Sequence, residues 1–245
     1  MNTNKIQLER ERAKNYELPT IASAPHLVAL TRNNVAKVEA MIRTDSNYRI
    51  SLGDDYGSDE FSPYWIKKLE KYLKGESVVE TIEDIVENIV KKLDKENSTH
   101  LNTDGVGLKQ MPERILAHKE TLLDDLKNRN FDLIKILSAK TIPLGGKHHG
   151  RENISFASKF CHYACFYIFE GQEAQDNFSI YDNVVAKALL EYLKFYNIYA
   201  DIKKIKNKDY AVYSKAIDAV IEASGNEISR NGFDHLVWYY FKGRA

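Results

Sequence analysis

The sequence predicts an all-α protein built of two helical lobes. Apolar residues recur at helical spacing in one segment after another. The 245 residues include only five prolines, and the candidate strands are short, covering residues 48–52 and 199–205. No internal repeat is visible, so we treat the chain as a single unit, 1–245. A polar, glycine-containing loop near residues 97–109 divides it into possible lobes 1–105 and 106–245.

The part before this loop carries three helical patterns. Residues 33–44 place apolar side chains on one side of a helix. The next helix, 62–75, opens with Ser62 as N-cap and Pro63 at its first position. Residues 77–95 repeat Val and Ile at helical spacing.

The part after the loop continues the helical pattern. Helices are expected over residues 112–128, 131–139, 156–169, 183–196, 209–223 and 229–241. A short basic, glycine-containing loop, 142–151, lies between the second and third of these.

The composition is that of an ordinary soluble protein, with 43% hydrophobic and 29% charged residues. No apolar run approaches the roughly 20 residues needed to span a bilayer, and the N-terminus has no apolar signal region. We expect a cytoplasmic protein with no membrane partner. The 35 basic and 35 acidic residues balance, which argues against coating nucleic acid by bulk charge but leaves room for a local basic face.

The basic loop has the residues of a phosphate-binding site. Its glycines permit backbone conformations in which successive amides point at one anion. Donors suited to phosphate surround them, and Ser155 can cap the helix that follows. The residues concerned are Gly145, Gly146, Lys147, His148, His149, Gly150, Arg151 and Ser155. The alternative interpretation is a solvated surface turn.

Lys159 lies on the aromatic face of the 156–169 helix, with Phe156, His162, Tyr163 and Phe166 as its neighbours. A helix that is apolar on nearly all sides should be largely buried. The helix dipole and desolvation would both lower the pKa of this lysine, which is what a Schiff-base-forming nucleophile requires. The alternative is a lysine that extends its charged end to solvent.

Asp182 precedes the 183–196 helix, and aspartate is a preferred N-cap. A carboxylate at a helix start can cap the helix and also face a cleft, so both a structural and a functional role stay open. A metal site formed by Cys161, His162 and Cys165 is a further alternative, with His118 or His235 as a distant donor. We expect the two cysteines to be small core residues instead, and no metal. No nucleotide-binding motif appears, and we expect no cofactor.

The order of these parts resembles the helix-hairpin-helix DNA glycosylases, especially the 8-oxoguanine DNA glycosylase branch. The resemblance covers residues 142–190. Ser155-Phe-Ala-Ser-Lys159-Phe-Cys resembles the lysine helix of that family, and Ser179-Ile-Tyr-Asp182-Asn-Val-Val resembles its aspartate element. It implies a helix-hairpin-helix-like element, a cleft between the two lobes, Lys159 as the Schiff-base nucleophile and Asp182 as the transition-state stabiliser.

The resemblance also implies the partner: double-stranded DNA with a modified base, bound by a monomer that has glycosylase and possible abasic-site lyase activity. The excised base would be 8-oxoguanine, in repair, or glucosylated hydroxymethylcytosine of phage DNA, in defence. The residues expected to line the base pocket are Phe156, His162, Tyr163, Phe166 and Trp238. A non-catalytic helical DNA-binding or partner-binding protein is the alternative.

Overall fold

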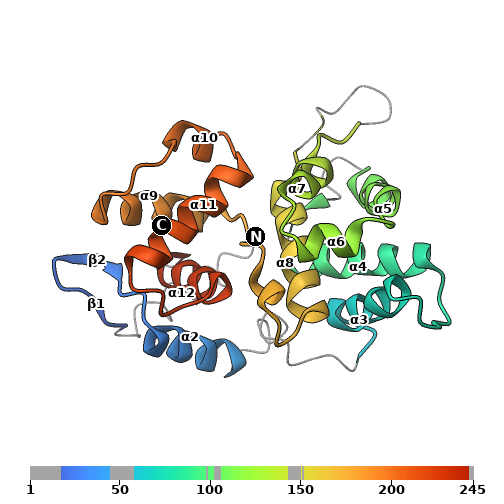
Figure 1. Cartoon of the computed structure of the whole chain (residues 1–245), viewed down its shortest axis with the longest axis horizontal. Helices are drawn as coiled ribbons and strands as arrows, with labels where there is room; N and C mark the ends of the chain where they lie inside the picture. Colours follow the sequence, from blue (N-terminus) through green and yellow to red (C-terminus); the bar gives the residue numbers. More distant parts are fainter. Residues whose placement is uncertain are drawn as a thin grey trace, which may run out of the picture. The chain divides into compact units, whose positions relative to one another are not determined.

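The computed structural model describes residues 18–44, 58–97, 99–101, 106–142, 150 and 152–242 (Figure 1). Most of these residues are helical. The strands among the described residues form one antiparallel pair, β1 (Thr20–Ile21) and β2 (Ala24–Val28). The all-α class predicted from the sequence is therefore confirmed. Within the described residues, none of the helices is both long enough and apolar enough to cross a membrane.

The chain divides into two compact units. The first unit comprises residues 1–46 and 181–245, and the second comprises residues 47–180. These bounds differ from the lobes 1–105 and 106–245 predicted from the sequence. The difference arises because the C-terminal helices pack with the N-terminal elements of the chain, so that the second unit is an insertion in the first.

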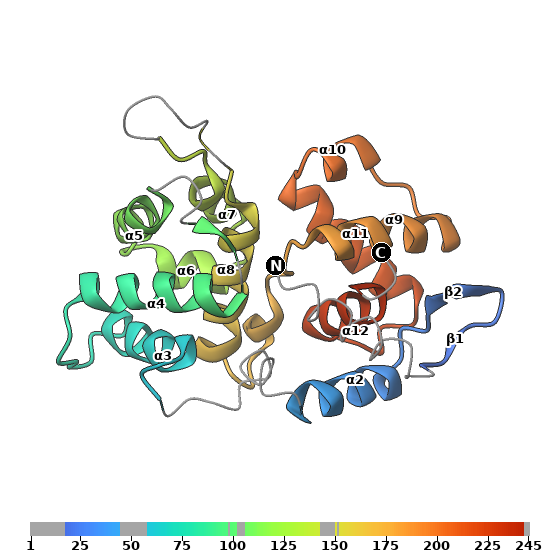
Figure 2. The ribbon, with the colours of Figure 1, turned by 180° about the vertical axis from the view of Figure 1, so that it is seen from behind.

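The first unit consists of the β1–β2 pair and five described helices. They are α2 (Arg32–Thr44), α9 (Asn183–Phe195), α10 (Ile202–Lys206), α11 (Tyr210–Ala223) and α12 (Arg230–Lys242). Helix α12 packs against both α2 and α9, while α11 packs against α9 and α12 (Figure 2). The Tyr192 hydroxyl of α9 donates a hydrogen bond to the Val28 carbonyl, 2.8 Å away, and so fastens the hairpin to this core.

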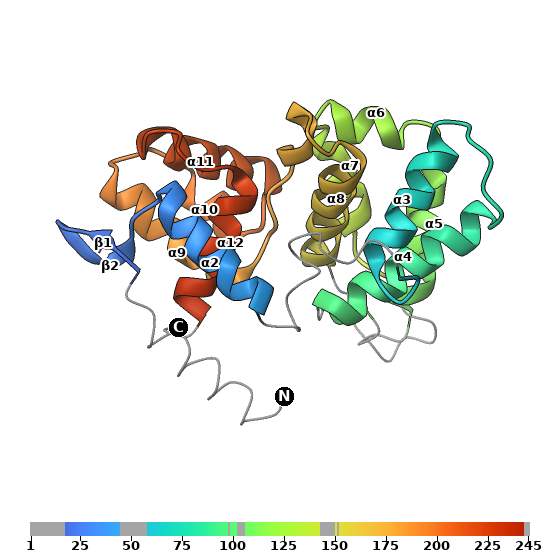
Figure 3. The ribbon, with the colours of Figure 1, turned by 90° about the horizontal axis from the view of Figure 1, so that it is seen from below.

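The second unit is assembled around its last long helix. Its elements are α3 (Ser62–Leu73), α4 (Ile82–Asn97), α5 (Gly107–Ala117), α6 (Leu122–Lys127), α7 (Phe131–Ser138), α8 (Ile154–Ile168) and the 3₁₀ helix η3 (Glu173–Asp176). Helix α8 packs against α3, α4, α6, α7 and η3 (Figure 3). Because so many elements cover α8, nearly every side of it must be apolar, as its sequence predicts.

Several predicted details of the elements are wrong. The single helix predicted over 112–128 is two helices, α5 and α6, and α5 begins inside the loop predicted near 97–109. Ser62 is not the N-cap of α3 but its first residue, and Phe61 holds the N-cap position. The start of α3 is capped by Glu96 of α4, whose carboxylate accepts from the Ser62 amide at 2.8 Å and from the Ser62 hydroxyl at 2.6 Å. The strand predicted over 199–205 is instead largely α10, because Asp201 caps a helix there by accepting from the Lys204 amide at 3.0 Å. The strand predicted over 48–52 lies outside the described residues.

Candidate functional site

The loop that joins α7 to α8 is closed at its base. The Asn153 amide donates to the Ser138 carbonyl at 3.0 Å. Further along the loop, Gly150 lies so close to Thr141 that a Cβ atom on it would come within 2.0 Å of the Thr141 carbonyl oxygen. Glycine is therefore required at position 150 so that the backbone there can lie against the backbone of Thr141. The other predicted phosphate-binding residues of the loop, Gly145, Gly146, Lys147, His148, His149 and Arg151, lie outside the described residues, and their role stays a prediction.

Two side chains of α5 bind the backbone where this loop begins, at residues 137–142. The Arg114 guanidinium donates to the carbonyls of Leu137, Ala139 and Lys140 at 3.2, 2.5 and 2.9 Å. The Gln110 amide makes two hydrogen bonds to the backbone of Ile142, at 2.7 and 2.9 Å. Neither residue stands out in the sequence, since each is a single polar position on an amphipathic helix. Together they position the loop's start on the second unit's helices.

The helix that follows presents a single half-buried stripe. All residues of α8 except Ser155, Lys159 and Phe166 are buried. These three are spaced at i, i+4 and i+11, so they share one side of the helix. The predicted capping role of Ser155 is wrong, because α8 begins one residue earlier, at Ile154, with Asn153 at the N-cap position.

Lys159 reaches the end of a second helix. Its Nζ donates to the carbonyl of Asn97, the last residue of α4, at 3.0 Å, and the Tyr163 hydroxyl donates to the Asn97 side chain at 3.2 Å. A helix C-terminus carries partial negative charge, and the amine of Lys159 lies at that end of α4. The lowered pKa expected of a nucleophilic lysine stays a prediction.

The aromatic neighbours of Lys159 are packed into the second unit. His162 is 1% exposed, and its Nδ1 lies 2.7 Å from the Phe178 carbonyl, which makes Nδ1 the donor. Its ring stacks on Phe166 at 6.2 Å and meets Tyr163 edge-on at 5.1 Å. Phe156 is buried and stacks on Phe160 at 6.4 Å. His162 thus ties α8 to the segment that leads to Asp182, while the pocket role of these rings stays a prediction.

Asp182 is the N-cap of α9, as predicted. It has extended backbone angles, and its Oδ1 accepts from the Val184 amide at 2.7 Å. The residue is half-buried. Asp182 belongs to the first unit and Lys159 to the second, so their proximity stays a prediction.

Two tyrosines accompany Asp182 in the first unit. The rings of Tyr181 and Tyr213 are 4.9 Å apart. Burial, and then the charge of Asp182, raise the pKa of the Tyr181 hydroxyl; burial, and then Asp234, raise the pKa of the Tyr213 hydroxyl well above its usual range. Both phenols therefore stay protonated at neutral pH and are able to donate hydrogen bonds. The sequence patterns around Asp182 did not single out either tyrosine.

The last residue predicted for the base pocket, Trp238, lies half-buried on α12 of the first unit. The Nζ of Lys242 lies 3.9 Å from the centre of its ring, in a cation–π contact. Such a contact covers one face of the ring. A role of Trp238 in a pocket stays a prediction.

The two cysteines are core residues, as predicted. Cys161 and Cys165 are both buried, and burial raises the pKa of each thiol. The Cys165 thiol lies 3.6 Å from the Leu126 carbonyl, a long contact typical of sulfur. Within the described part of the chain, no three histidine, cysteine or carboxylate side chains gather into a group that could hold a metal ion.

Comparisons of the chain with protein-family models, curated proteins and solved structures gave no match. The chemical argument therefore rests on the residues themselves. The amine of Lys159, on the half-buried stripe of α8, and the carboxylate of Asp182, at the start of α9, stay the two groups that the sequence predicts to act on a substrate. A loop closed at its base precedes them both.

Proposed function

We propose that the protein is a DNA glycosylase that flips and excises a modified base from double-stranded DNA. The observation that carries the proposal is the order of three parts along the chain. A loop closed at its base by Ser138 and Asn153 leads into the helix of Lys159, and a segment held by His162 leads from there to the N-cap Asp182. Each part has a physical role in removing a base that has left the stack.

Asp182 would stabilise the positive charge that develops on the sugar as the bond to the base breaks. Its carboxylate already accepts from the amide of Val184 and would keep a second oxygen for this purpose. Lys159 would attack the sugar carbon that loses the base and form a Schiff base, which would also permit cleavage of the strand. For that step the amine must exchange the Asn97 carbonyl for the substrate.

The substrate of the proposed reaction is either glucosylated hydroxymethylcytosine of phage DNA or 8-oxoguanine. The loop between α7 and α8 would hold the phosphates through its backbone amides and basic side chains. Arg114 and Gln110 support this role by fixing the backbone at residues 137–142, where the loop begins. The protein would act as a monomer in the cytoplasm, without a cofactor.

A second candidate is a non-catalytic DNA-binding or partner-binding protein. The observation that favours it is the hydrogen bond from Lys159 to the Asn97 carbonyl, which gives the lysine a structural role between α8 and α4. The cap at Asp182 likewise has a structural role of its own. The two candidates differ in whether replacing either residue removes an activity.

Release of the base tests the proposal. Duplexes that contain 8-oxoguanine or glucosylated hydroxymethylcytosine are incubated with the protein, and abasic sites are revealed by alkali. We expect Asp182→Asn to lower the rate of release at least about a hundredfold, since asparagine keeps the cap but not the charge. The matched control is Asp209→Asn, because Asp209 caps α11 by accepting from the Val212 amide at 3.2 Å. Equal rates for the two variants would contradict the role of the Asp182 charge in base release. No release by the wild type from any duplex would favour the non-catalytic candidate.

A further inference from the structure

The end of the first unit formed by the C-terminus of α9 and by α10 is strongly basic. Five lysines lie within fifteen residues there and all are exposed: Lys194, Lys203, Lys204, Lys206 and Lys208. None of the five forms an ion pair with a described residue. In the second unit, Lys67, Lys68, Lys74 and Lys91 pair with glutamates, whereas Lys95 and Lys127 form no ion pair with a described residue. In a chain whose net charge is zero, this local excess stands out.

The two acids that flank α10, Asp201 and Asp209, are engaged in caps, and Glu191, three residues before Lys194 on α9, forms no ion pair with it. Asp201 accepts from the Lys204 amide at the start of α10, and Asp209 accepts from the Val212 amide at the start of α11. A capping carboxylate is held against its own helix and answers the positive end of that helix's dipole. The lysine charges are therefore left for an anionic partner.

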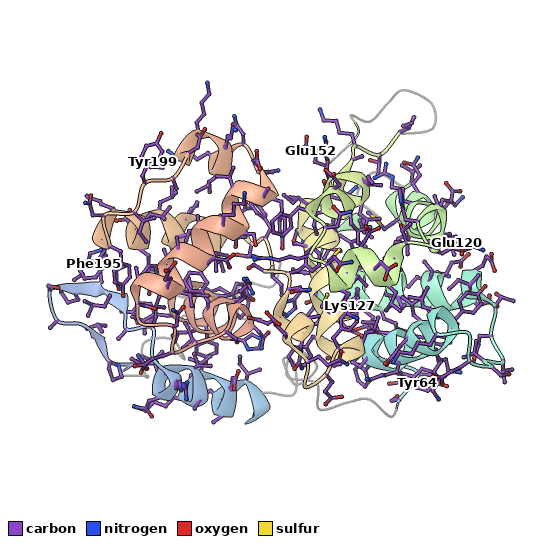
Figure 4. All side chains as sticks on the ribbon, viewed as in Figure 1. Tyr64, Glu120, Lys127, Glu152, Phe195 and Tyr199 are labelled. Carbon is purple, nitrogen blue, oxygen red and sulfur yellow. The ribbon has the colours of Figure 1, made fainter. Side chains whose placement is uncertain are left out.

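Exposed apolar side chains lie among the lysines. Tyr199 is 98% exposed and lies beside α10 (Figure 4). Ile202, at the first position of α10, is 46% exposed. Lysines interleaved with an exposed aromatic ring are typical of surfaces that bind a nucleic-acid strand, because the lysines meet phosphates while the ring stacks on a base.

The backbone that carries these side chains is well fixed. Asn197 and Lys208 adopt left-handed angles, with φ of 53° and 64°, immediately after the C-caps of α9 and α10. In each case the following amide bonds back across the helix end, Ile198 to the Leu193 carbonyl and Asp209 to the Lys204 carbonyl, both at 2.9 Å. This is the Schellman arrangement, which bridges a helix end to the chain that follows.

The conformation of Lys208 is itself informative. The corresponding positions after α3 and α11 are Gly75 and Gly225, with φ of 74° and 105°. Glycine is the usual residue there because a side chain is disfavoured in the left-handed region. Arg129 occupies the same position after α6, with φ of 55°. A lysine in this position places a positive charge beside the C-terminus of α10 at a small cost in backbone energy.

We propose that this surface, formed by Lys194, Tyr199, Ile202, Lys203, Lys204, Lys206 and Lys208, binds the phosphate backbone of a nucleic-acid strand, with Tyr199 stacking on an unpaired base. We call it the α9–α10 surface. Asp182 is at the other end of α9, about 20 Å away for a helix of this length. The surface is therefore separate from the chemistry proposed above and requires neither Lys159 nor Asp182.

Salt-dependent binding tests this proposal. The full chain is titrated against an unmodified, fluorescently labelled DNA, single-stranded or duplex, at several salt concentrations. The test variant is Lys203→Gln/Lys204→Gln/Lys206→Gln. The matched control, Lys91→Gln/Lys95→Gln/Lys127→Gln, removes the same charge from lysines exposed on the second unit. We expect the test variant to bind at least about tenfold more weakly at low salt, with the logarithmic salt slope reduced by about one per lost phosphate contact.

Equal binding by the test and control variants would overturn the proposal. So would a test variant that loses affinity for vesicles containing phosphatidylserine while it binds DNA as tightly as the wild type, since the partner would then be a membrane surface. Single-stranded RNA of the same sequence is the third probe, and it decides which kind of strand binds more tightly. None of the probes contains a modified base, so failure of the glycosylase proposal leaves these results intact.

Two single variants separate lost contacts from lost folding. Lys208→Gly should bind more weakly yet melt no lower than the wild type, because glycine suits the left-handed position. Tyr199→Ala should weaken binding to the single strand by about fivefold or more and leave duplex binding nearly unchanged. Unchanged binding by both variants would contradict the assigned roles of charge and ring.

Discussion

Lys159 and Asp182 both complement the charge of a helix end, but over very different distances along the chain. Asp182 accepts from Val184, two residues away, at the positive end of α9. Lys159 donates to Asn97, 62 residues away, at the negative end of α4. The first contact forms as soon as α9 forms, whereas the second requires α4 and α8 to be packed together. The position of the lysine therefore depends on the packing of α4 against α8.

Replacing Glu96, the neighbour of Asn97, should give the largest loss of stability among the variants that test this comparison. It caps α3 from a distance through two hydrogen bonds to Ser62, which is 1% exposed. Glu96→Ala should destabilise the second unit by about 2 kcal/mol, because buried donors lose their acceptor. The chain has two tryptophans, so unfolding in denaturant is followed through Trp65 of α3 in a Trp238→Phe background.

The control for that prediction is Glu87→Ala on the same helix. Glu87 is exposed and pairs with Lys91 one turn away at 2.9 Å, a contact expected to contribute no more than about 0.5 kcal/mol. Equal losses for the two variants would mean that the remote cap is no stronger than a surface pair. A remote contact of the second unit would then contribute no more stability than a local one.

A smaller effect is expected from the local cap. Asp182→Ala should destabilise the first unit by about 1 kcal/mol, whereas Asp182→Asn should change its stability by only a few tenths, since asparagine caps equally well. Unfolding is followed through Trp238 of α12 in a Trp65→Phe background. An Asn variant as unstable as the Ala variant would show that the charge of Asp182, and not its cap bond, stabilises α9.

The smallest effect concerns pH. Burial raises the pKa of Glu96 above its ordinary value of 4.5, although the bonds from Ser62 oppose the shift. The folded state thus holds more protons than the unfolded state between 4.5 and the raised pKa, so stability should fall as pH rises through that interval. Glu96→Gln should flatten this part of the stability curve. A slope unchanged in that variant would assign the pH dependence to another group.

The sequence predicts the helices well because their periodic apolar faces and caps are local signals. The predictions for α7, α9, α11 and α12 agree with the structure to within about a residue at each end. The strand predicted over 199–205 fails because aromatic and branched residues there favour a strand, while the Asp201 cap and the buried Ile205 hold a helix. The β1–β2 pair was missed because β1 is only two residues long.

In the candidate site, the local contact of Asp182 was predictable from the sequence, whereas the contacts between distant segments were not. The cap at Asp182 follows from the residues beside it, and the structure has it as expected. The partner of Lys159 could not be predicted, because Asn97 lies in a distant stretch that reads as the start of a loop. Arg114 and Gln110 act through packing between α5 and the loop after α7, a relation that leaves no pattern in the sequence.

Borohydride trapping tests the central claim most directly. The wild type and Lys159→Gln are incubated with duplexes containing 8-oxoguanine or glucosylated hydroxymethylcytosine, reduced, and compared for covalent protein–DNA adducts. Lys135→Gln, on the exposed side of α7, is the control. We predict an adduct with the wild type and with the control, absent from Lys159→Gln, and mapped to Lys159 by peptide analysis. An adduct of equal yield from Lys159→Gln would contradict the account.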